Sequence, residues 1–398
     1  MNKIKIIDSG CGKGKSSWAI QYMNENPHKK FIYITPFKEE IKTRILTDCT
    51  NFYEPKHLLT CKYDNFIKLL KEGRNIASTH ALFRSSKSEV IELIELYGYT
   101  LILDEVMDVV EQIPLKKDDL QNMLKIGLVE ISDTGYLKWI DKENCSQYDN
   151  IKELCLNDSV FIVNNCCLMW TFPVKIFNSF KDVYVLTYMF DCQIQKYYYD
   201  LFNIEYEYFS VYKNESTNKY YLGNKREDIP NKDLFDIYEG NLNEIGSKNS
   251  ALSKSWFSKY RNTGAGILKH NIYNYFRNIV KGTAKETLWT TFKDFQEKLS
   301  SKGFSSCFLY CTARATNEYR KKTIVIYALN KFLNPLLKQF FIDNKIEIDE
   351  EKYALSEMIQ FIYRSAIRDN KQIKLYIPSN RMRLLLQDFL DKSTVSRH

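Results

Sequence analysis

The residue types and spacing near the amino terminus fit the binding of phosphate groups. Residues Ser9 to Ser16 read Ser-Gly-Cys-Gly-Lys-Gly-Lys-Ser, which matches the pattern GxxxxGK[ST] except that Ser9 replaces the first glycine. In such a loop, glycines let backbone N–H groups approach the phosphates, a lysine supplies positive charge and a hydroxyl binds Mg²⁺. The residues expected to bind a nucleoside triphosphate are Gly10, Gly12, Lys13, Gly14, Lys15, Ser16 and Ser17.

A pair of acidic residues, Asp104 and Glu105, directly follows the apolar run Leu101–Leu103. An acidic residue at the end of a buried strand is the second half of a nucleotide site of this kind. We expect Asp104 and Ser16 to hold Mg²⁺, and Glu105 to polarise the water that attacks the γ-phosphate. The two motifs together predict hydrolysis of ATP with Mg²⁺ as the cofactor.

These motifs require an α/β fold, because each follows a short apolar run typical of a buried parallel strand. The strands expected in the first part of the chain are Lys3–Ile7, Phe31–Thr35, Asn75–Thr79, Tyr99–Leu103, Ser159–Val163 and Val183–Thr187. The second part contains expected helices over 272–280, 319–329 and 355–367, and an expected strand over 373–377. Residues 211–255 have few apolar runs, so the predicted division is a lobe over 1–210, a linker or insertion over 211–255, and a lobe over 256–398.

Composition restricts the class of protein without selecting a function. A length of 398 residues, with 44% hydrophobic and 27% charged residues, fits a globular chain of two domains. No apolar run is long enough to cross a bilayer and no signal peptide is visible, so we expect a cytoplasmic protein with no membrane partner. The ten cysteines form no metal-binding pattern and are interpreted as reduced thiols. A net charge of +8 permits a polyanionic partner.

The order of the motifs resembles that of superfamily 2 helicases, and specifically the compact phage-encoded helicases of the DEAD/DEAH-box type. Tyr33-Ile-Thr-Pro36 resembles the family's motif that touches the nucleic-acid backbone, and Ser78–Leu82 resembles the segment that follows it. Val185-Leu-Thr-Tyr188 resembles the motif that couples hydrolysis to lobe movement. In this lobe the resemblance implies nucleic-acid contacts from Thr35, Pro36, Thr79 and His80.

Two segments of the second lobe extend the resemblance. Residues 311–319 resemble the motif that contacts both nucleotide and strand, which implies nucleic-acid contacts from Arg314, Thr316 and Asn317. Residues 360–368 resemble QxxGRxxR, with a tyrosine in place of the glycine and the last arginine displaced by one position. The resemblance implies catalytic roles for Gln360, Arg364 and Arg368, with one of the arginines reaching the γ-phosphate, and it leaves open which one.

The fold implied by the resemblance is two tandem RecA-like P-loop lobes, each a mainly parallel sheet covered by helices. The function implied is an ATP-dependent helicase or translocase, acting on DNA in phage replication or recombination. The family's adenine-reading segment has no room before the first strand, which favours DNA over RNA as the partner. Replication proteins are further candidate partners, the expected location is the host-cell cytoplasm, and a monomer is favoured while the oligomeric state stays open.

Three alternatives remain open at the level of the sequence. A DNA-packaging motor ATPase shares the glycine loop and the Asp-Glu pair, and would add a nuclease lobe with clustered carboxylates. A nucleotide-gated binding switch would bind ATP and hydrolyse it slowly. The segment Ser253–Arg261 mixes basic and aromatic residues, and Trp256 and Phe257 fit base stacking as well as they fit a core.

Overall fold

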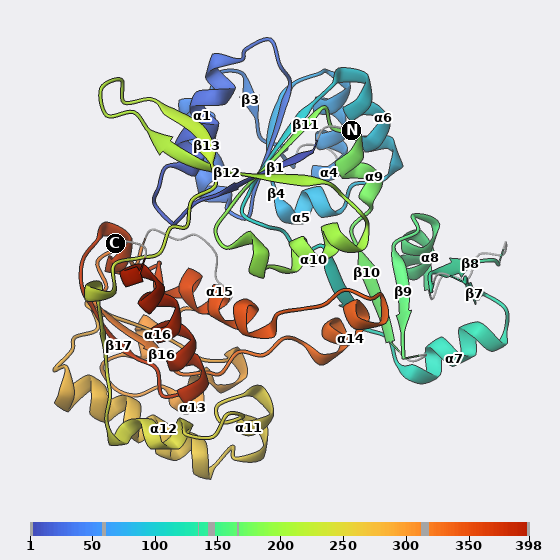
Figure 1. Ribbon diagram of the computed structural model, residues 1–398. Coiled ribbons are helices and arrows are strands. Elements are labelled where there is room, and N and C mark those ends of the chain that lie inside the picture. Colours follow the sequence, from blue (N-terminus) through green and yellow to red (C-terminus); the bar gives the residue numbers. More distant parts are fainter. Residues whose placement is uncertain are drawn as a thin grey trace. The chain divides into compact units, whose positions relative to one another are not determined.

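The computed structural model describes residues 3–57, 61–133, 135–141, 148–164, 167–311 and 318–395 (Figure 1). Internal contacts divide the chain into two units, and each is described by itself. The first unit consists of Met1–Ser9, Lys13–Arg226 and Asn334–Ile348, and the second consists of Gly10–Gly12, Glu227–Leu333 and Asp349–His398. The domain limits 1–210, 211–255 and 256–398 stay a prediction from composition.

The first unit is built on an eight-stranded sheet in which one pairing, at one end of the sheet, is antiparallel. In spatial order its strands are β13 (Tyr220–Asn224), β12 (Tyr206–Lys213), β1 (Ile4–Asp8), β11 (Asp182–Thr187), β5 (Thr100–Asp104), β2 (Phe31–Thr35), β4 (Asn75–Thr79) and β3 (Phe52–Tyr53). β12 and β13 pair antiparallel, and every other neighbouring pair is parallel. The carboxyl ends of the parallel strands therefore meet at one edge, where open α/β sheets place their ligands.

Both faces of this sheet are covered by helices, so its central strands are apolar on both sides. Along β5, Leu101 and Leu103 face one core cluster, and Ile102 faces the other. The face of Ile102 is covered by α1 (Lys15–Glu25) and the π-helical turn Ile41–Ile45, between α2 (Lys38–Glu40) and α3 (Leu46–Asp48). The opposite face is covered by α4 (Lys62–Lys71), α5 (His80–Arg84), α6 (Ser88–Tyr97), α9 (Val174–Ser179) and α10 (Ile194–Leu201).

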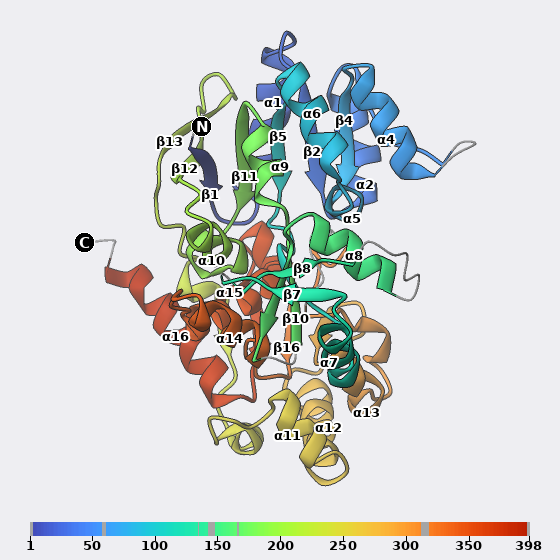
Figure 2. The same ribbon diagram turned by 90° about the vertical axis from the view of Figure 1, so that its right-hand side faces the viewer.

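A smaller group of elements is inserted between β5 and β11. It contains the antiparallel sheet β6 (Val110–Ile113), β10 (Cys167–Thr171) and β9 (Val160–Val163), and the hairpin β7 (Val129–Ile131) and β8 (Leu137–Trp139). Two helices, α7 (Lys117–Lys125) and α8 (Asp149–Leu156), lie beside the hairpin in both Figure 1 and Figure 2. The helix α14 (Pro335–Asp343) returns to this unit and adds Phe340 and Phe341 to its core.

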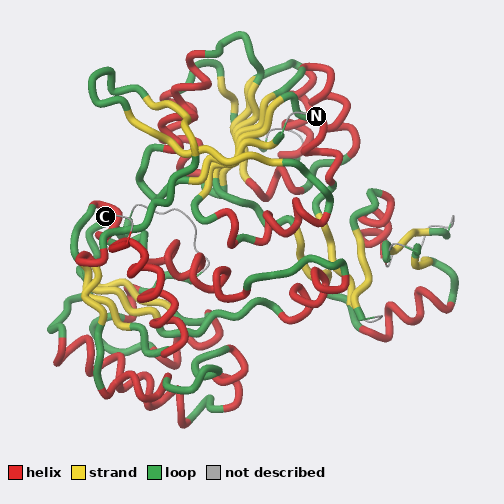
Figure 3. Tube along the Cα trace, in the orientation of Figure 1, coloured by secondary structure: helices red, strands yellow, loops and turns green. Residues whose placement is uncertain are grey.

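The second unit has a four-stranded, fully parallel sheet. Its strands, in spatial order, are β14 (Phe235–Ile237), β17 (Ile373–Tyr376), β16 (Ile324–Tyr327) and β15 (Thr287–Thr290). Its helices are α11 (Lys254–Lys259), α12 (Thr263–Asn274), α13 (Gln296–Leu299), α15 (Glu350–Ile362) and α16 (Asn380–Val395). Figure 3 shows the strands of each unit in yellow, bordered by red helices. The predicted fold class, two α/β lobes with mainly parallel sheets covered by helices, is confirmed.

Two local predictions are wrong. The helix predicted over 319–329 is replaced by the strand β16, because Ile324, Val325 and Ile326 are fully buried β-branched residues between two neighbouring strands. The predicted strand at 159–163 exists as β9, but it pairs antiparallel with β10 in the small sheet and is absent from the large parallel sheet. The predicted linker 211–255 also contains regular structure, including β13, β14 and the helix start at Lys254.

Candidate functional site

The glycine loop joins the carboxyl end of β1 to the first turn of α1. Gly14 caps α1 in the left-handed conformation, with φ +93°, which glycine adopts without steric cost. The ring of Tyr220, on β13, lies directly against it, since a Cβ at position 14 would be 2.3 Å from Tyr220 Cε1. Any other residue at this position would therefore have a strained backbone and a clash.

Tyr220 is fixed to the helix that follows the loop. Its backbone N–H donates to Gln21 Oε1 at 2.8 Å, and Gln21 Nε2 donates to its carbonyl oxygen at 3.0 Å. The tyrosine itself is half-buried and packs against the core on the α1 face. The hairpin of β12 and β13 thus lies beside the glycine loop and limits how far the start of α1 can move.

The two loop lysines have different environments. Lys13 is exposed, whereas Lys15 is buried and its Nζ donates to the carbonyl oxygen of Ser9 at 2.6 Å. Ser9, which replaces the usual glycine, has its own structural role. Its Oγ accepts a hydrogen bond from Val211 N at 2.9 Å, and its N–H donates to Thr187 O at 3.1 Å. The serine therefore joins the loop to the strands on both sides of β1.

Asp104, at the end of β5, is close to the first turn of α1. Its Oδ2 accepts hydrogen bonds from Ser16 Oγ at 3.2 Å and from the hydroxyl of Tyr33 at 2.5 Å. Burial, together with the carboxylates of Glu40 and Glu105, raises the pKa of Asp104 well above its usual range. The structure therefore brings Ser16 and Asp104, the two predicted metal ligands, into contact.

These groups fit a bound Mg²⁺. A hydroxyl and a carboxylate are both oxygen ligands, which Mg²⁺ prefers, and the ion usually retains water and substrate phosphate for its other positions. Burial, followed by the nearby carboxylates of Glu40 and Glu105, raises the pKa of Asp104. A divalent cation would offset this negative charge, as metal ions do in phosphate sites.

Glu105 follows Asp104 with an unusual backbone conformation. Its φ is +64°, a left-handed value that is uncommon for a residue with a side chain. Its N–H donates to the carbonyl oxygen of Leu186, on β11, at 2.9 Å. Such strained residues cluster at functional sites, where the surrounding structure holds them in place. The conformation turns the chain away from β5 immediately after the acidic pair.

The segment that resembles the coupling motif lies between the two halves of the site. β11 pairs with β1 on one side and with β5 on the other. At its end, Gln193 Nε2 donates to Thr187 Oγ1 at 3.0 Å and to Tyr188 O at 2.6 Å. Asp8 accepts hydrogen bonds from the N–H groups of Met189 and Phe190 at 2.9 and 3.2 Å. The end of β11 is therefore bonded to the residue before the glycine loop.

Thr35 is connected to the glycine loop through a chain of side chains. It is fully buried, and its Oγ1 donates to Glu40 Oε2 at 3.0 Å, while Pro36 after it is half-buried. Glu40 pairs with Arg44 at 3.5 Å, and Arg44 Nη2 donates to Ser17 Oγ at 3.4 Å. The nucleic-acid contacts expected of Thr35 and Pro36 stay a prediction.

Thr79 and His80 also have structural partners. Thr79 caps α5, because its Oγ1 accepts a hydrogen bond from Leu82 N at 3.5 Å. The Nε2 of His80 lies 3.1 Å from the carbonyl oxygen of Asp104. This contact brings the second predicted strand-binding segment next to the acidic pair, and its contact with nucleic acid stays a prediction.

The remaining predicted site residues belong to the second unit. Gln360 lies on α15, Arg364 follows its end and is buried, and Arg368 is half-buried in the short 3₁₀ helix Ala366–Asp369. Gly10 and Gly12 group with this unit as well, and Gly12 has a φ of +83°. Their catalytic and binding roles stay predictions. Arg314, Thr316 and Asn317 lie outside the described residues.

The sequence interpretation missed four residues of the site, namely Tyr33, Glu40, Arg44 and Tyr220. Tyr33 was assigned to a predicted strand and to the segment Tyr33–Pro36, with no role at Asp104. Its position in β2, opposite Ile102 of β5, brings its hydroxyl to Asp104. Alternation along a strand would place Tyr33 on the α1 face, so this signal could have been used. Tyr220 gave no comparable signal, because its approach to Gly14 depends on a pairing between distant strands.

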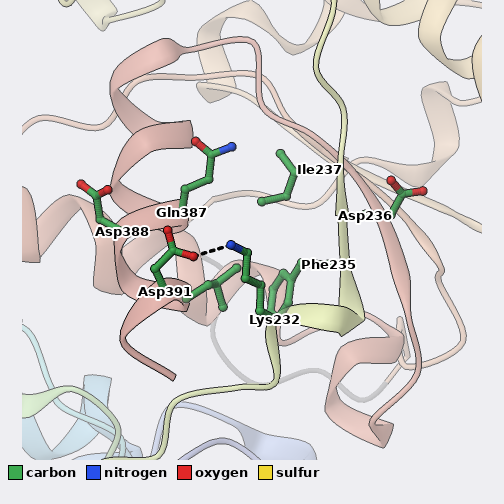
Figure 4. A pocket seen from close by; sticks show the side chains of 8 residues that line it. Lys232, Phe235, Asp236, Ile237, Gln387, Asp388 and Asp391 are labelled. Atoms are coloured by element: carbon green, nitrogen blue, oxygen red, sulfur yellow. Dashed lines mark hydrogen bonds and ion pairs between the residues drawn. The ribbon is translucent and has the colours of Figure 1, made fainter. Parts of the chain in front are cut away.

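One pocket lies in the second unit (Figure 4). It has a volume of about 520 Å³, and an ion pair joins Lys232 to Asp391 at its wall. The residues that line it are Lys232, Phe235, Asp236, Ile237, Gln387, Asp388, Leu390 and Asp391. With three acidic side chains and one lysine, this lining does not suit a phosphate.

In the described part of the chain, no helix combines the length and apolar character that a membrane crossing requires.

The geometry defines an α/β protein of two units, with Lys15, Ser16 and the Asp-Glu strand end in the first. The chain belongs to the YonV family. It is 43% identical over 410 residues to the SPbeta prophage-derived uncharacterized protein YonV of Bacillus subtilis (strain 168), with 98% of this chain and 99% of that protein covered. Residues 230–390 match the YonV C-terminal Rossmann-like domain, and residues 110–170 match the YonV middle domain.

One solved structure, apo XPD, supports the fold. Apo XPD matches with a TM-score of 0.55 at 13% identity, covering 98% of this chain and 95% of that chain. Xpd4 of S. tokodaii matches with a TM-score of 0.43 at 14% identity, covering 97% and 94%. The likeness to apo XPD agrees with the expected resemblance to superfamily 2 helicases at the level of the fold. At this identity it shows the fold alone.

Proposed function

We propose that the chain is an Mg²⁺-dependent ATPase that moves along nucleic acid, as a helicase or translocase. The observation that carries the proposal is the contact between the two halves of the site, in which Ser16 Oγ lies 3.2 Å from Asp104 Oδ2. A lysine, a hydroxyl and two carboxylates at the ends of β1 and β5 are the groups that hydrolysis of a γ-phosphate uses. XPD-like architecture and the family's match to a prophage protein favour DNA in phage replication or recombination as the setting.

In this proposal each residue has a defined task. The loop N–H groups and the helix start surround the phosphates, and Lys15 moves from Ser9 O to the phosphate oxygens. Ser16 and Asp104 would hold Mg²⁺, which would neutralise charge at the phosphates when bound. Glu105 orients the attacking water and accepts its proton as the bond to the γ-phosphorus forms and the bond to the leaving oxygen breaks.

The strand β11 supplies a route from hydrolysis to movement. It is bonded to Ser9 through Thr187 and to Glu105 through Leu186. A shift of the glycine loop or of the acidic pair would therefore displace the end of β11. Hydrogen bonds from Gln193 and to Asp8 hold this end in place. This arrangement supports the coupling role that the resemblance implies for Val185–Tyr188.

Replacing Glu105 with glutamine distinguishes a motor from a nucleotide-gated switch. We expect this variant to bind ATP normally and to hydrolyse it about a thousandfold more slowly, because an amide cannot accept the proton. Asp108→Asn is the matched control, since Asp108 is exposed and lies three residues further along the chain. Single-turnover hydrolysis and equilibrium binding of a fluorescent ATP analogue give the two readouts. A slow wild type that Glu105→Gln leaves unchanged would favour the switch.

A further inference from the structure

One segment of the second unit carries a net positive charge equal to that of the whole chain. Residues 245–285 contain eight lysine and arginine residues and no aspartate or glutamate. The whole chain has 57 basic and 49 acidic residues, so 49 of each remain outside the segment, which therefore accounts for the entire net charge of +8. Charge gathered in this way is the electrostatic mark of a surface for a polyanion.

The structure buries five large apolar side chains of this segment and leaves most of its cations exposed. Phe257 of α11, and Leu268, Ile272, Tyr275 and Phe276 of α12 and the turn after it, are buried in the core of the second unit. The cations that point to solvent are Lys248, Lys254, Lys259, Arg261, Arg277, Lys281 and Lys285, and Lys269 is half-buried. The helices α11 and α12 lie side by side in Figures 1 and 2.

Trp256, which could have served base stacking, is needed inside the unit. A Cβ at Gly264 would lie 2.6 Å from its ring, so the tryptophan packs directly on the start of α12. It also makes edge contact with Phe257, with ring centroids 5.1 Å apart. The aromatic residues of Ser253–Arg261 that the sequence left undecided therefore join α11 to α12. Bases that stack on this surface would therefore need a different aromatic ring.

Tyr260 and Tyr273 are the exposed rings of this segment, and Tyr273 is the one that lies among the cations of α12 and the turn after it. It is 39% exposed and lies on α12 four residues after Lys269 and four before Arg277, so the three share one face of the helix and its continuation. Lys281 lies just beyond the end of that turn, which covers Tyr275–Ile279, and its φ is +50°. An exposed aromatic ring flanked by cations is the combination that binds single strands, with bases stacking on the ring and phosphates on the charges.

The cations on this face have no acidic partner in the described part of the chain. Lys254, on α11, pairs with Asp294 at 3.8 Å, whereas no described carboxylate forms an ion pair with Lys269, Arg277 or Lys281. Arg277 and Lys281 are four residues apart in the chain, and their like charges repel each other. A bound polyanion would remove this repulsion.

We propose that this basic face, defined by Lys269, Tyr273, Arg277 and Lys281, binds the backbone and bases of a single-stranded nucleic acid without regard to sequence. The inference rests on the proposed function and adds a contact outside the motifs that resemble those of helicases. A nucleic acid fits better than an anionic membrane. Most of the apolar face that a membrane-surface helix would insert is, in α12, already buried in the core around Ile272, and Ile267 and Ile279 are its exposed aliphatic residues.

The test compares two triple variants that lose the same charge. Lys269→Gln/Arg277→Gln/Lys281→Gln alters the proposed face, and Lys321→Gln/Lys371→Gln/Lys374→Gln alters exposed lysines elsewhere in the second unit. Binding of a labelled oligothymidylate is titrated over a range of salt concentrations. We expect about a tenfold greater loss of affinity in the first variant. Its log–log salt slope should decrease by about 2, because each phosphate that is no longer neutralised lowers the slope by roughly 0.7.

Tyr273→Ala gives a second measurement that does not depend on charge. We expect it to weaken oligothymidylate binding about fivefold or more while the salt slope stays unchanged, because stacking is removed and the cations still bind phosphates. Equal losses in the two triple variants would overturn the proposal. So would intact oligothymidylate binding in the first variant together with lost binding to phosphatidylserine vesicles, which would assign the face to a membrane.

The same variants separate this inference from the proposed function. Hydrolysis of ATP in the absence of nucleic acid should be unchanged in the first triple variant, because its substitutions leave Lys15, Asp104 and Glu105 intact. If the wild type binds oligothymidylate through the basic face yet shows no hydrolysis that depends on Lys15, the proposed ATPase function fails and the nucleic-acid surface stands.

Discussion

Lys15→Ala is expected to reduce ATP hydrolysis by about a hundredfold or more and to weaken ATP binding. The lysine is buried beside the loop, where its ammonium lies 2.6 Å from Ser9 O and can transfer to the phosphates when nucleotide binds. Removing one preorganised group that stabilises developing charge in a water-poor site typically costs about two to three orders of magnitude in rate. Steady-state hydrolysis with Mg²⁺ and titration with a fluorescent ATP analogue measure the two effects.

Lys13→Ala is the comparison for this variant, because Lys13 is also expected to bind the nucleotide but is an exposed lysine of the same loop. Lys13 is exposed, so its charge is screened by water, and we expect less than a fivefold change in rate. Thermal unfolding of both variants checks that the loop still folds. Equal losses in Lys13→Ala and Lys15→Ala would show that the loop does not hold phosphate in the expected way.

Arg364→Ala is expected to lower kcat by about a thousandfold while ATP binding is retained. An arginine that contacts the γ-phosphate in the transition state contributes about three to five orders of magnitude to kcat. Arg364 has the spacing from Gln360 that the resembled motif requires, whereas Arg368 is displaced by one position. We therefore expect a smaller loss, of about tenfold, from Arg368→Ala, and the same assay applied to both variants compares them directly.

Because Arg364 is buried, its substitution needs a check on folding. Arg364→Lys keeps a positive charge but cannot form the paired contacts of a guanidinium, so it should fold and still lose most of kcat. A large loss confined to Arg368→Ala would move the catalytic role to that residue. Full activity in both alanine variants would contradict the motif assignment for 360–368.

The strands that carry the site were predictable because they are short, apolar and bounded by clear breaks. Phe31–Thr35, stopped by Pro36, and Asn75–Thr79 agree with β2 and β4 at both ends. The same reasoning failed for 319–329, where burial between β15 and β17 decided in favour of a strand. It also could not give the partner of β9, since antiparallel pairing with β10 depends on the fold of the inserted group.

The site itself was predictable only where a motif encodes it. Lys15, Ser16 and Asp104 were found from the glycine loop and the strand end, and the structure brings Ser16 and Asp104 together. Tyr33 and Tyr220 were not, because their contacts with Asp104 and Gly14 arise from strand order in the sheet. The basic face was also missed. The sequence shows that its cations are close together in the chain, but which of them share an exposed face depends on which side of α12 is buried in the core.

The most direct test is the steady-state ATP hydrolysis of the full chain with Mg²⁺, measured without and with single-stranded DNA or RNA. We predict that nucleic acid raises the rate at least about tenfold, that the rise weakens steeply with salt, and that Lys15→Ala shows none of it. A wild-type rate that is unchanged by either nucleic acid would contradict the proposal that this chain is a nucleic-acid motor.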